Sequence, residues 1–153
     1  ARRGQLTDDA RHSRPDGAGP QARSAVSATV DAAGVPVRVT SVHVQHREEN
    51  TPTRLDQLDA LLAAEPVEDA YVLAGDLNAE PGWDEIALLE DAGLESGQDV
   101  AGDPAALRSP AEAPARRIDW VLGSPAVTFR SVEVLDVTTS DHRPLLAELR
   151  AED

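Results

Sequence analysis

The stretch Ala70-Tyr-Val-Leu-Ala-Gly-Asp-Leu-Asn-Ala-Glu-Pro81 joins a short apolar run to two polar side chains. Residues 70–74 have the composition of a buried strand, which we expect to end at the glycine that follows. Positions two apart share one side of a strand, so Asp76 and Asn78 should project together just beyond its end. Pro81 cannot donate to a β-ladder and suits the first turn of a helix. The stretch predicts a strand-to-helix junction able to hold a metal ion or a phosphate, or simply to cap the helix.

Composition narrows the class of protein. The chain has 153 residues, 41% of them hydrophobic, which suffices for one domain with a core. Cysteine is absent, so disulfides, thiolate metal sites and cysteine nucleophiles are excluded. The formal charge is −14 and all basic side chains are Arg, which argues against broad non-specific binding to nucleic acid. Aromatic residues make up 3%, too few for a base-stacking platform.

The sequence shows neither a long apolar run nor a signal-peptide core. We therefore expect no membrane span in this chain. The localisation stays open between a cytoplasmic and a secreted protein, because a targeting segment could lie outside the given sequence.

The first half of the chain predicts an arm, a hairpin and a helix. Residues 1–21 lack apolar periodicity and are expected to form an irregular arm, in which His12 is solvated. Residues 24–31 and 35–44 alternate as two strands of a hairpin, and the second of them has His43 near its end. Thr51 should be the N-cap of a helix that extends to residues 65–66.

The second half predicts a helix, a loop and three strands. Residues 81–92 should form the helix, closed by Gly93, and residues 94–115 have the composition of a long surface loop. The three strands are expected at 116–123, 127–137 and 143–149. This order favours a layered α/β or α+β sheet with helices on one face, in one domain spanning residues 22–150.

Polar residues recur near the ends of the predicted strands. His43, the Asp76–Asn78 pair, Asp119 and Asp141-His142 all occupy such positions, and polar groups at one rim of a sheet commonly form a site. Each has an ordinary alternative: His43 as a hydrogen-bonded edge residue, Asp141-His142 as a simple turn. Asp119 lies in an apolar strand, where a carboxylate needs a partner.

Four segments in this order resemble the endonuclease/exonuclease/phosphatase superfamily of metal-dependent phosphohydrolases. They are Ser41-Val-His43-Val, Gly75-Asp76-Leu-Asn78, Arg117-Ile-Asp119-Trp120-Val and Ser140-Asp141-His142-Arg143-Pro144. The resemblance covers about residues 22–149. It implies an α+β fold that is part of a four-layer α/β/β/α sandwich, with a mixed, largely antiparallel sheet and helices on one face.

The resemblance also implies roles for the residues it matches. His142 resembles the general base that activates water, Asp119 the carboxylate that orients it, and His43 the histidine that donates to a phosphate oxygen. Asp76 and Asn78 resemble the pair that contacts the phosphate and helps to hold the metal. Three further residues are candidates: Asp141 as a metal ligand, and Arg47 and Arg143 as substrate contacts or plain solvated surface.

The implied cofactor is Mg²⁺ or Mn²⁺, because oxygen ligands suit hard cations; His46 near His43 is weak support for zinc. The chain matches the C-terminal portion of the family, and no counterpart of the family's N-terminal Asn and metal-binding Glu occurs in it. We expect an N-terminal half in the full protein, and an apolar sheet face left uncovered here. The expected activity is that of a phosphodiesterase, phosphatase or nuclease acting on a phosphate ester of a small molecule, lipid headgroup or nucleic acid. The alternative is an inactive remnant or binding module.

Overall fold

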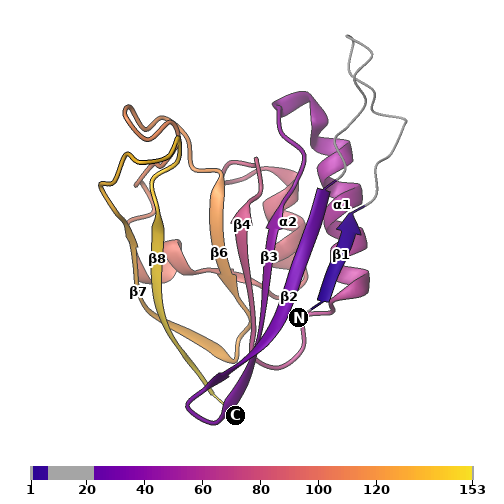
Figure 1. Cartoon of the computed structure of the whole chain (residues 1–153). Helices are drawn as coiled ribbons and strands as arrows, with labels where there is room; N and C mark the ends of the chain where they lie inside the picture. The colour runs from indigo at the N-terminus through magenta and orange to yellow at the C-terminus, as the bar shows by residue number, and fades with distance from the viewer. Residues whose placement is uncertain (1, 7–22, 153) are drawn as a thin grey trace.

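The computed structural model describes residues 2–6 and 23–152 of the chain. A six-stranded sheet carries its two longer helices on one face and a two-stranded sheet on the other (Figure 1). The strands are β1 (Arg2–Leu6), β2 (Arg23–Ala32), β3 (Val35–His43), β4 (Tyr71–Asp76), β5 (Glu95–Ser96), β6 (Asp119–Gly123), β7 (Val127–Val134) and β8 (Leu145–Ala151). The helices are η2 (Glu48–Asn50, a 3₁₀ turn), α1 (Thr51–Ala64), α2 (Asp84–Asp91) and α3 (Gly97–Ala101).

The large sheet is mixed and largely antiparallel, as expected. Its strand order is β1-β2-β3-β4-β6-β5, and β7 pairs with β8 in the second sheet. β3 and β4 are parallel, joined by the crossover helix α1, whereas the other pairs are antiparallel. A parallel connection needs such a crossover, so the helix after β3 follows from the pairing of β3 with β4.

Two apolar clusters fix the layers. On one face, Leu58 and Leu61 of α1 and Leu89 of α2 are buried in a cluster with Leu73 and Leu122 of the sheet. On the other face, a second cluster joins residues of β3, β4 and β6 to those of β7 and β8; it includes Val37, Val72, Val121, Val127 and Val132. The helix layer, the large sheet and the second sheet thus belong to an α/β/β/α sandwich.

Part of the second face is uncovered. Val26 and Val30 of β2 are 44% and 50% exposed, and their register partners Ser41 and Val37 place them on the face that carries the second sheet. The expectation of an uncovered apolar sheet face is therefore met only at Val26 and Val30 of β2, because β7 and β8 cover this face over β3, β4 and β6.

Residues 2–6 correct the prediction of an irregular arm. They form β1, an edge strand that pairs antiparallel with β2 from Arg2↔Ser27 to Leu6↔Arg23. The segment lacks apolar periodicity, so its strand state depends on a neighbouring strand edge rather than on its own pattern. The predicted irregular residues 7–21, including His12, lie outside the described residues.

The stretch 94–115 was wrongly predicted to be all loop. It contains β5 and the short helix α3, which Ser96 caps through its Oγ and the amide of Asp99. Both elements are too short for a periodic pattern, and they form by packing: α3 contacts β7 and β6.

Other boundaries moved by a few residues. β4 continues through Gly75 and Asp76 instead of ending at the glycine. Thr51 is the first helical residue of α1 rather than its N-cap, which is Asn50. α2 begins at Asp84 because residues 81–83 form a turn, and β6 to β8 span 119–123, 127–134 and 145–151. Among the described residues, no helix is long and apolar enough to cross a membrane.

Candidate active site

Three polar residues form one row across the centre of the large sheet. His43 of β3 pairs with Asp76 of β4, and Asp76 in turn pairs with Asp119 of β6. Directly opposed residues project to the same face of a sheet. This face also carries Val121 of β6, two residues after Asp119, so it is the face that β7 and β8 cover. Strand register alone therefore gathers residues that lie 33 to 76 positions apart in the chain.

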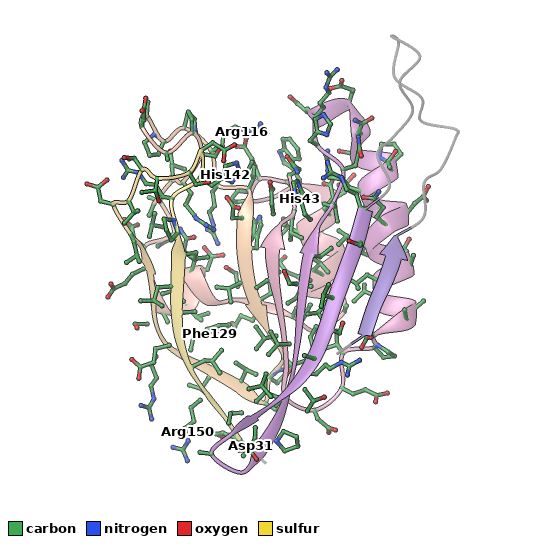
Figure 2. All side chains as sticks on the ribbon, viewed as in Figure 1. Asp31, His43, Arg116, Phe129, His142 and Arg150 are labelled. Carbon is green, nitrogen blue, oxygen red and sulfur yellow. The ribbon has the colours of Figure 1, made fainter. Side chains whose placement is uncertain are left out.

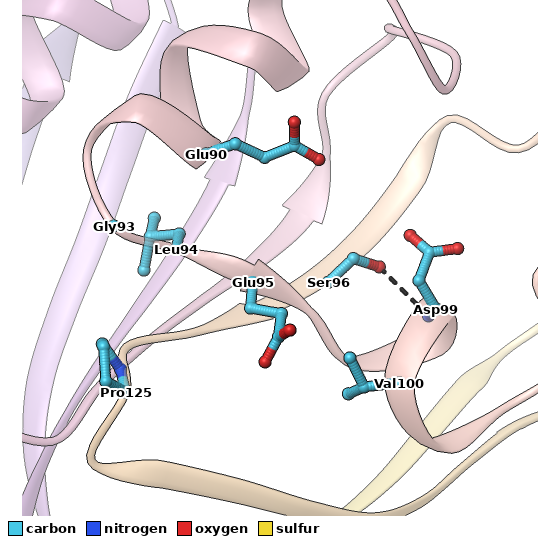
Figure 3. Close-up of a pocket in the computed structure, with 8 residues that line it drawn as sticks. All are labelled: Glu90, Gly93, Leu94, Glu95, Ser96, Asp99, Val100 and Pro125. Carbon is cyan, nitrogen blue, oxygen red and sulfur yellow. Dashed lines mark hydrogen bonds between the residues drawn. The ribbon is translucent and has the colours of Figure 1, made fainter.

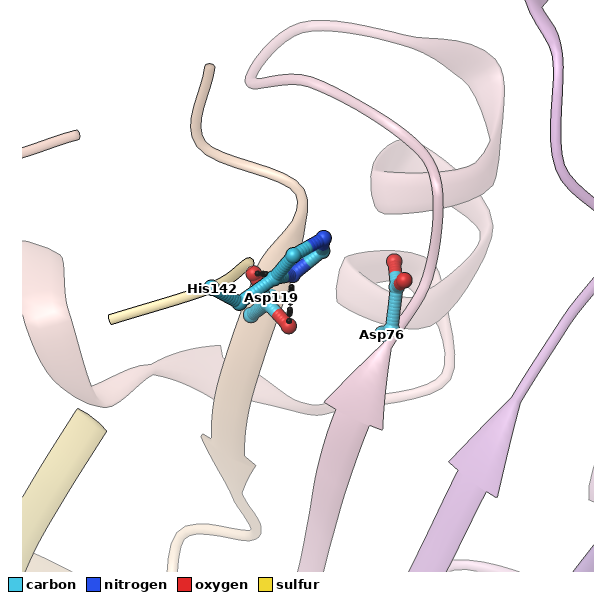
Figure 4. A group of neighbouring side chains, drawn as sticks. All are labelled: Asp76, Asp119 and His142. Carbon is cyan, nitrogen blue, oxygen red and sulfur yellow. Dashed lines mark hydrogen bonds and ion pairs between the residues drawn. The ribbon is translucent and has the colours of Figure 1, made fainter. Parts of the chain in front are cut away.

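His142 joins this row from the turn before β8. Its Nδ1 lies 2.8 and 3.0 Å from the two carboxylate oxygens of Asp119 (Figure 4). Ligand atoms of Asp76, Asp119 and His142 lie within 4.8 Å of one another. On the other side of Asp76, His43 Nε2 is 3.4 Å from Asp76 Oδ2. His43, His142 and Arg116 lie at the end of the sheet opposite to Asp31 and Arg150 (Figure 2).

Burial sets the electrostatics of the row. Desolvation raises the pKa of the Asp119 carboxyl, although Arg108 and His142 lower it in part. The pKa of the His43 imidazole is lowered, because the effect of partial burial exceeds the opposite effect of the Asp76 carboxylate. About half of the His43 side chain remains exposed. The lowered pKa favours the neutral imidazole, which can donate from one ring nitrogen.

Asn78 lies beyond the end of β4, in a backbone conformation that the strand pattern did not predict. β4 ends at Asp76, and Asn78 has a positive φ of 48°, so strand alternation no longer applies. Its backbone amide donates to Asp76 Oδ1 at 2.9 Å, and its Nδ2 donates to the Val44 carbonyl at 3.3 Å. Asn78 thus orients the Asp76 carboxylate and links the ends of β3 and β4.

Three predicted residues lie outside the central row. Asp141 is exposed, and a hydrogen bond from Ser140 lowers the pKa of its carboxyl. Arg47 is exposed and lies 3.8 Å from Glu49. Arg143 donates from Nε to the Ala111 carbonyl at 2.7 Å and pairs through Nη2 with Asp136 at 3.0 Å. Arg143 therefore links the turn of His142 to Ala111 and Asp136. Its role as a substrate contact stays a prediction.

Sequence reasoning missed Arg108. This side chain is 7% exposed, and its Nη1 lies 3.8 Å from Asp119 Oδ2. It comes from residues 102–115, which have neither periodicity nor a recognised motif. No signal in the sequence could have placed it beside Asp119, because only the folding of this connection onto the turn of His142 does so.

A separate hollow of about 550 Å³ lies between the end of α2, β5 and α3 (Figure 3). Glu90, Glu95 and Asp99 line it, and Asp99 is paired with Arg117 at 2.6 Å. Glu95 pairs with Gly123, at the opposite end of β6 from Asp119. The hollow is thus distinct from the row of polar residues.

The model of the Endonuclease/Exonuclease/phosphatase family matches residues 3–142, which is most of the chain and includes the whole row. The chain belongs to this family. The search of curated proteins found no match.

Solved structures agree with this family fold. An endonuclease/exonuclease/phosphatase from Beutenbergia cavernae superposes with a TM-score of 0.79 at 23% identity, over 99% of this chain and 45% of that one. The human Nocturnin catalytic domain with bound sulfate gives 0.71 at 17% identity, over 99% and 59%. A mannosyl-6-phosphatase from Bacteroides thetaiotaomicron gives 0.68 at 16% identity, over 84% and 57%. This family member spans about half the length of those structures.

Proposed function

We propose that this chain carries the general base, His142, and its orienting carboxylate, Asp119, of a divalent-metal-dependent phosphoric ester hydrolase. The single observation that carries the proposal is the short contact between His142 Nδ1 and the carboxylate of Asp119. Nδ1–H donates to that carboxylate, which fixes the tautomer and leaves Nε2 as the basic nitrogen. Asp119 also stabilises the imidazolium that forms when Nε2 takes a proton.

The chemistry assigned to these residues is hydrolysis of a phosphate ester. Nε2 of His142 accepts a proton from water as the water oxygen bonds to phosphorus and the bond from phosphorus to the ester oxygen breaks. The leaving oxygen takes a proton from solvent. Neutral His43, at the other end of the row, donates a hydrogen bond to a phosphate oxygen as negative charge increases on it.

The residues present fit a hard divalent cation such as Mg²⁺ or Mn²⁺. Two carboxylates and one imidazole converge within 4.8 Å, and Asp119 is already engaged by His142, so Asp76 is the principal ligand. We assign Asn78 and Asp141 as its supporting ligands, which requires the amide of Asn78 or the turn of Asp141 to reorient. A bound cation would neutralise charge on the phosphate. A zinc site is disfavoured because oxygen donors dominate.

For the substrate, we propose a small-molecule or lipid-headgroup phosphate ahead of bulk nucleic acid. The net charge of −14 opposes a long polyanion, and Arg47, the exposed basic candidate for a substrate contact, has a carboxylate neighbour in Glu49. The structural relatives include a mannosyl-6-phosphatase and an endonuclease/exonuclease/phosphatase, so this likeness does not choose between the substrate classes. A binding module without activity is the alternative, and an N-terminal half supplying further ligands is part of the proposal for the full protein.

The test is hydrolysis of bis-p-nitrophenyl phosphate by this chain with Mg²⁺, with Mn²⁺ and with EDTA. We expect metal-dependent turnover that His142→Gln reduces by about 100-fold or more. His46→Gln is the matched control, because His46 contacts Arg23 rather than Asp119. Turnover that persists in His142→Gln would refute the base. A folded parent with no turnover would support the binding module. Equilibrium binding of Mn²⁺ and of inorganic phosphate to the parent would then test that alternative.

A further inference from the structure

The turn that carries His142 is attached to one short segment of the preceding connection, residues 108–111. Four hydrogen bonds join them. The Arg143 amide donates to the Arg108 carbonyl at 3.0 Å, and the Ala111 amide donates to the Asp141 carbonyl at 2.8 Å. Arg108 Nε donates to the Arg143 carbonyl at 2.8 Å, and Arg143 Nε donates to the Ala111 carbonyl at 2.7 Å. The backbone on both sides of His142 is therefore fixed by this segment.

Arg108 is the one side chain of this segment that also faces the partner of His142. Its Nη1 lies 3.8 Å from Asp119 Oδ2 while its Nε holds the Arg143 carbonyl. The guanidinium is planar and rigid, so these two contacts fix the distance between the turn and the β6 carboxylate. The side chain is 7% exposed, and water therefore competes little for either contact.

We infer that Arg108 is a positioning residue for the proposed hydrolysis: it holds the His142 turn and Asp119 in register, so that the imidazole faces the row. This inference rests on the proposed function for its effect on rate, but its structural part can be measured without turnover. Arg108 acts through Asp119 and the turn of His142, which it contacts, and is not itself assigned a chemical step.

Arg108→Met removes the guanidinium and keeps much of the apolar stem. Loss of a charge-assisted hydrogen bond should let the turn open more often, so the Arg143 and Ala111 amides should exchange with solvent about 10-fold faster or more. Amides of the β2–β3 ladder should keep their rates. The ¹⁵N shift of His142 Nδ1 should move away from that of a nitrogen bonded to a carboxylate.

Turnover provides the second measurement. A misplaced base should lower kcat by about 100-fold with little change in KM. Arg108→Lys should be intermediate, since a single ammonium reaches Asp119 or the Arg143 carbonyl but lacks the fork that reaches both. Arg130→Met is the matched control, because Arg130 is an exposed residue of β7 that pairs with Glu148 of β8.

The outcomes separate the two proposals. In one outcome the parent shows no turnover, while Arg108→Met speeds amide exchange in the turn and moves the ¹⁵N shift of His142 Nδ1. The positioning role is then supported, and the proposed hydrolysis by this chain is refuted. If Arg108→Met is folded and leaves exchange, the Nδ1 shift and kcat at the parent values, the positioning role is refuted. If Arg108→Met does not fold, Arg108→Lys carries the test, and parent-like exchange and kcat in that variant would refute the need for the guanidinium.

Discussion

The buried pair between Arg54 of α1 and Glu85 of α2 offers the strongest stability test. Both side chains are 0% exposed, and Arg54 Nε lies 2.6 Å from Glu85 Oε1. The guanidinium also donates to Thr51 Oγ1 at 2.8 Å and to the Arg47 carbonyl, and it lies 5.5 Å from the centre of the Trp83 ring. One cation thus joins both helices to the loop that follows β3.

Arg54→Met would leave Glu85 buried without its counter-charge. Removal of one partner from a buried ion pair costs about 3–5 kcal/mol, a large part of the roughly 5–15 kcal/mol that stabilises a domain. Arg54→Met/Glu85→Leu removes both charges, and replacement of a whole buried pair by apolar side chains is often near neutral. We therefore expect the double variant to recover at least about 1.5 kcal/mol of the loss.

Urea unfolding followed by far-UV circular dichroism measures these free energies without depending on Trp83, which lies beside the substitution. Arg130→Met breaks an exposed pair with Glu148 and should change the unfolding free energy by less than about 1 kcal/mol. A loss of under about 1 kcal/mol in Arg54→Met, or a double variant no more stable than that single variant, would contradict the reasoning.

Two further predictions concern the site strands. Gly75→Ala should destabilise the fold by more than about 3 kcal/mol in urea unfolding, because an added Cβ would lie 1.8 Å from the Val42 carbonyl oxygen. Gly82→Ala is the control for backbone strain: its φ is also positive, at +83°, but a Cβ there meets nothing within 4 Å, so it should cost less. Equal losses in the two variants would contradict this reasoning. Asp119→Asn should gain unfolding free energy relative to the parent as pH rises above 3.8, the ordinary pKa of an Asp carboxyl. The pKa of Asp119 is raised above its ordinary value of 3.8, so the folded parent loses stability as pH rises through that raised pKa. A difference between variant and parent that shrinks with pH would refute the sign.

Much of the site could be predicted from the sequence. Apolar runs ending in polar residues placed His43, Asp76 and Asp119 near strand ends, and the order of four motifs indicated the family, which the match over residues 3–142 confirms. The contact of His142 with Asp119 was expected from the resemblance, and the structure brings the two together at 2.8 Å. The assigned roles of all these residues stay predictions until turnover is measured.

Local sequence determined the elements with a periodic pattern: the strands of the hairpin, helix α1 and the buried strand β4. It could not determine β1, β5 or α3, because segments this short or irregular gain their structure only from a neighbouring strand edge or packed face. Nor could it place Arg108, since a residue in an aperiodic connection meets Asp119 only after β6 and the turn of His142 have come together. The order of residues along the chain determines the hydrophobic pattern of a single helix or strand. Contacts between helices and strands depend on strand register and side-chain packing, which exist only in the folded chain.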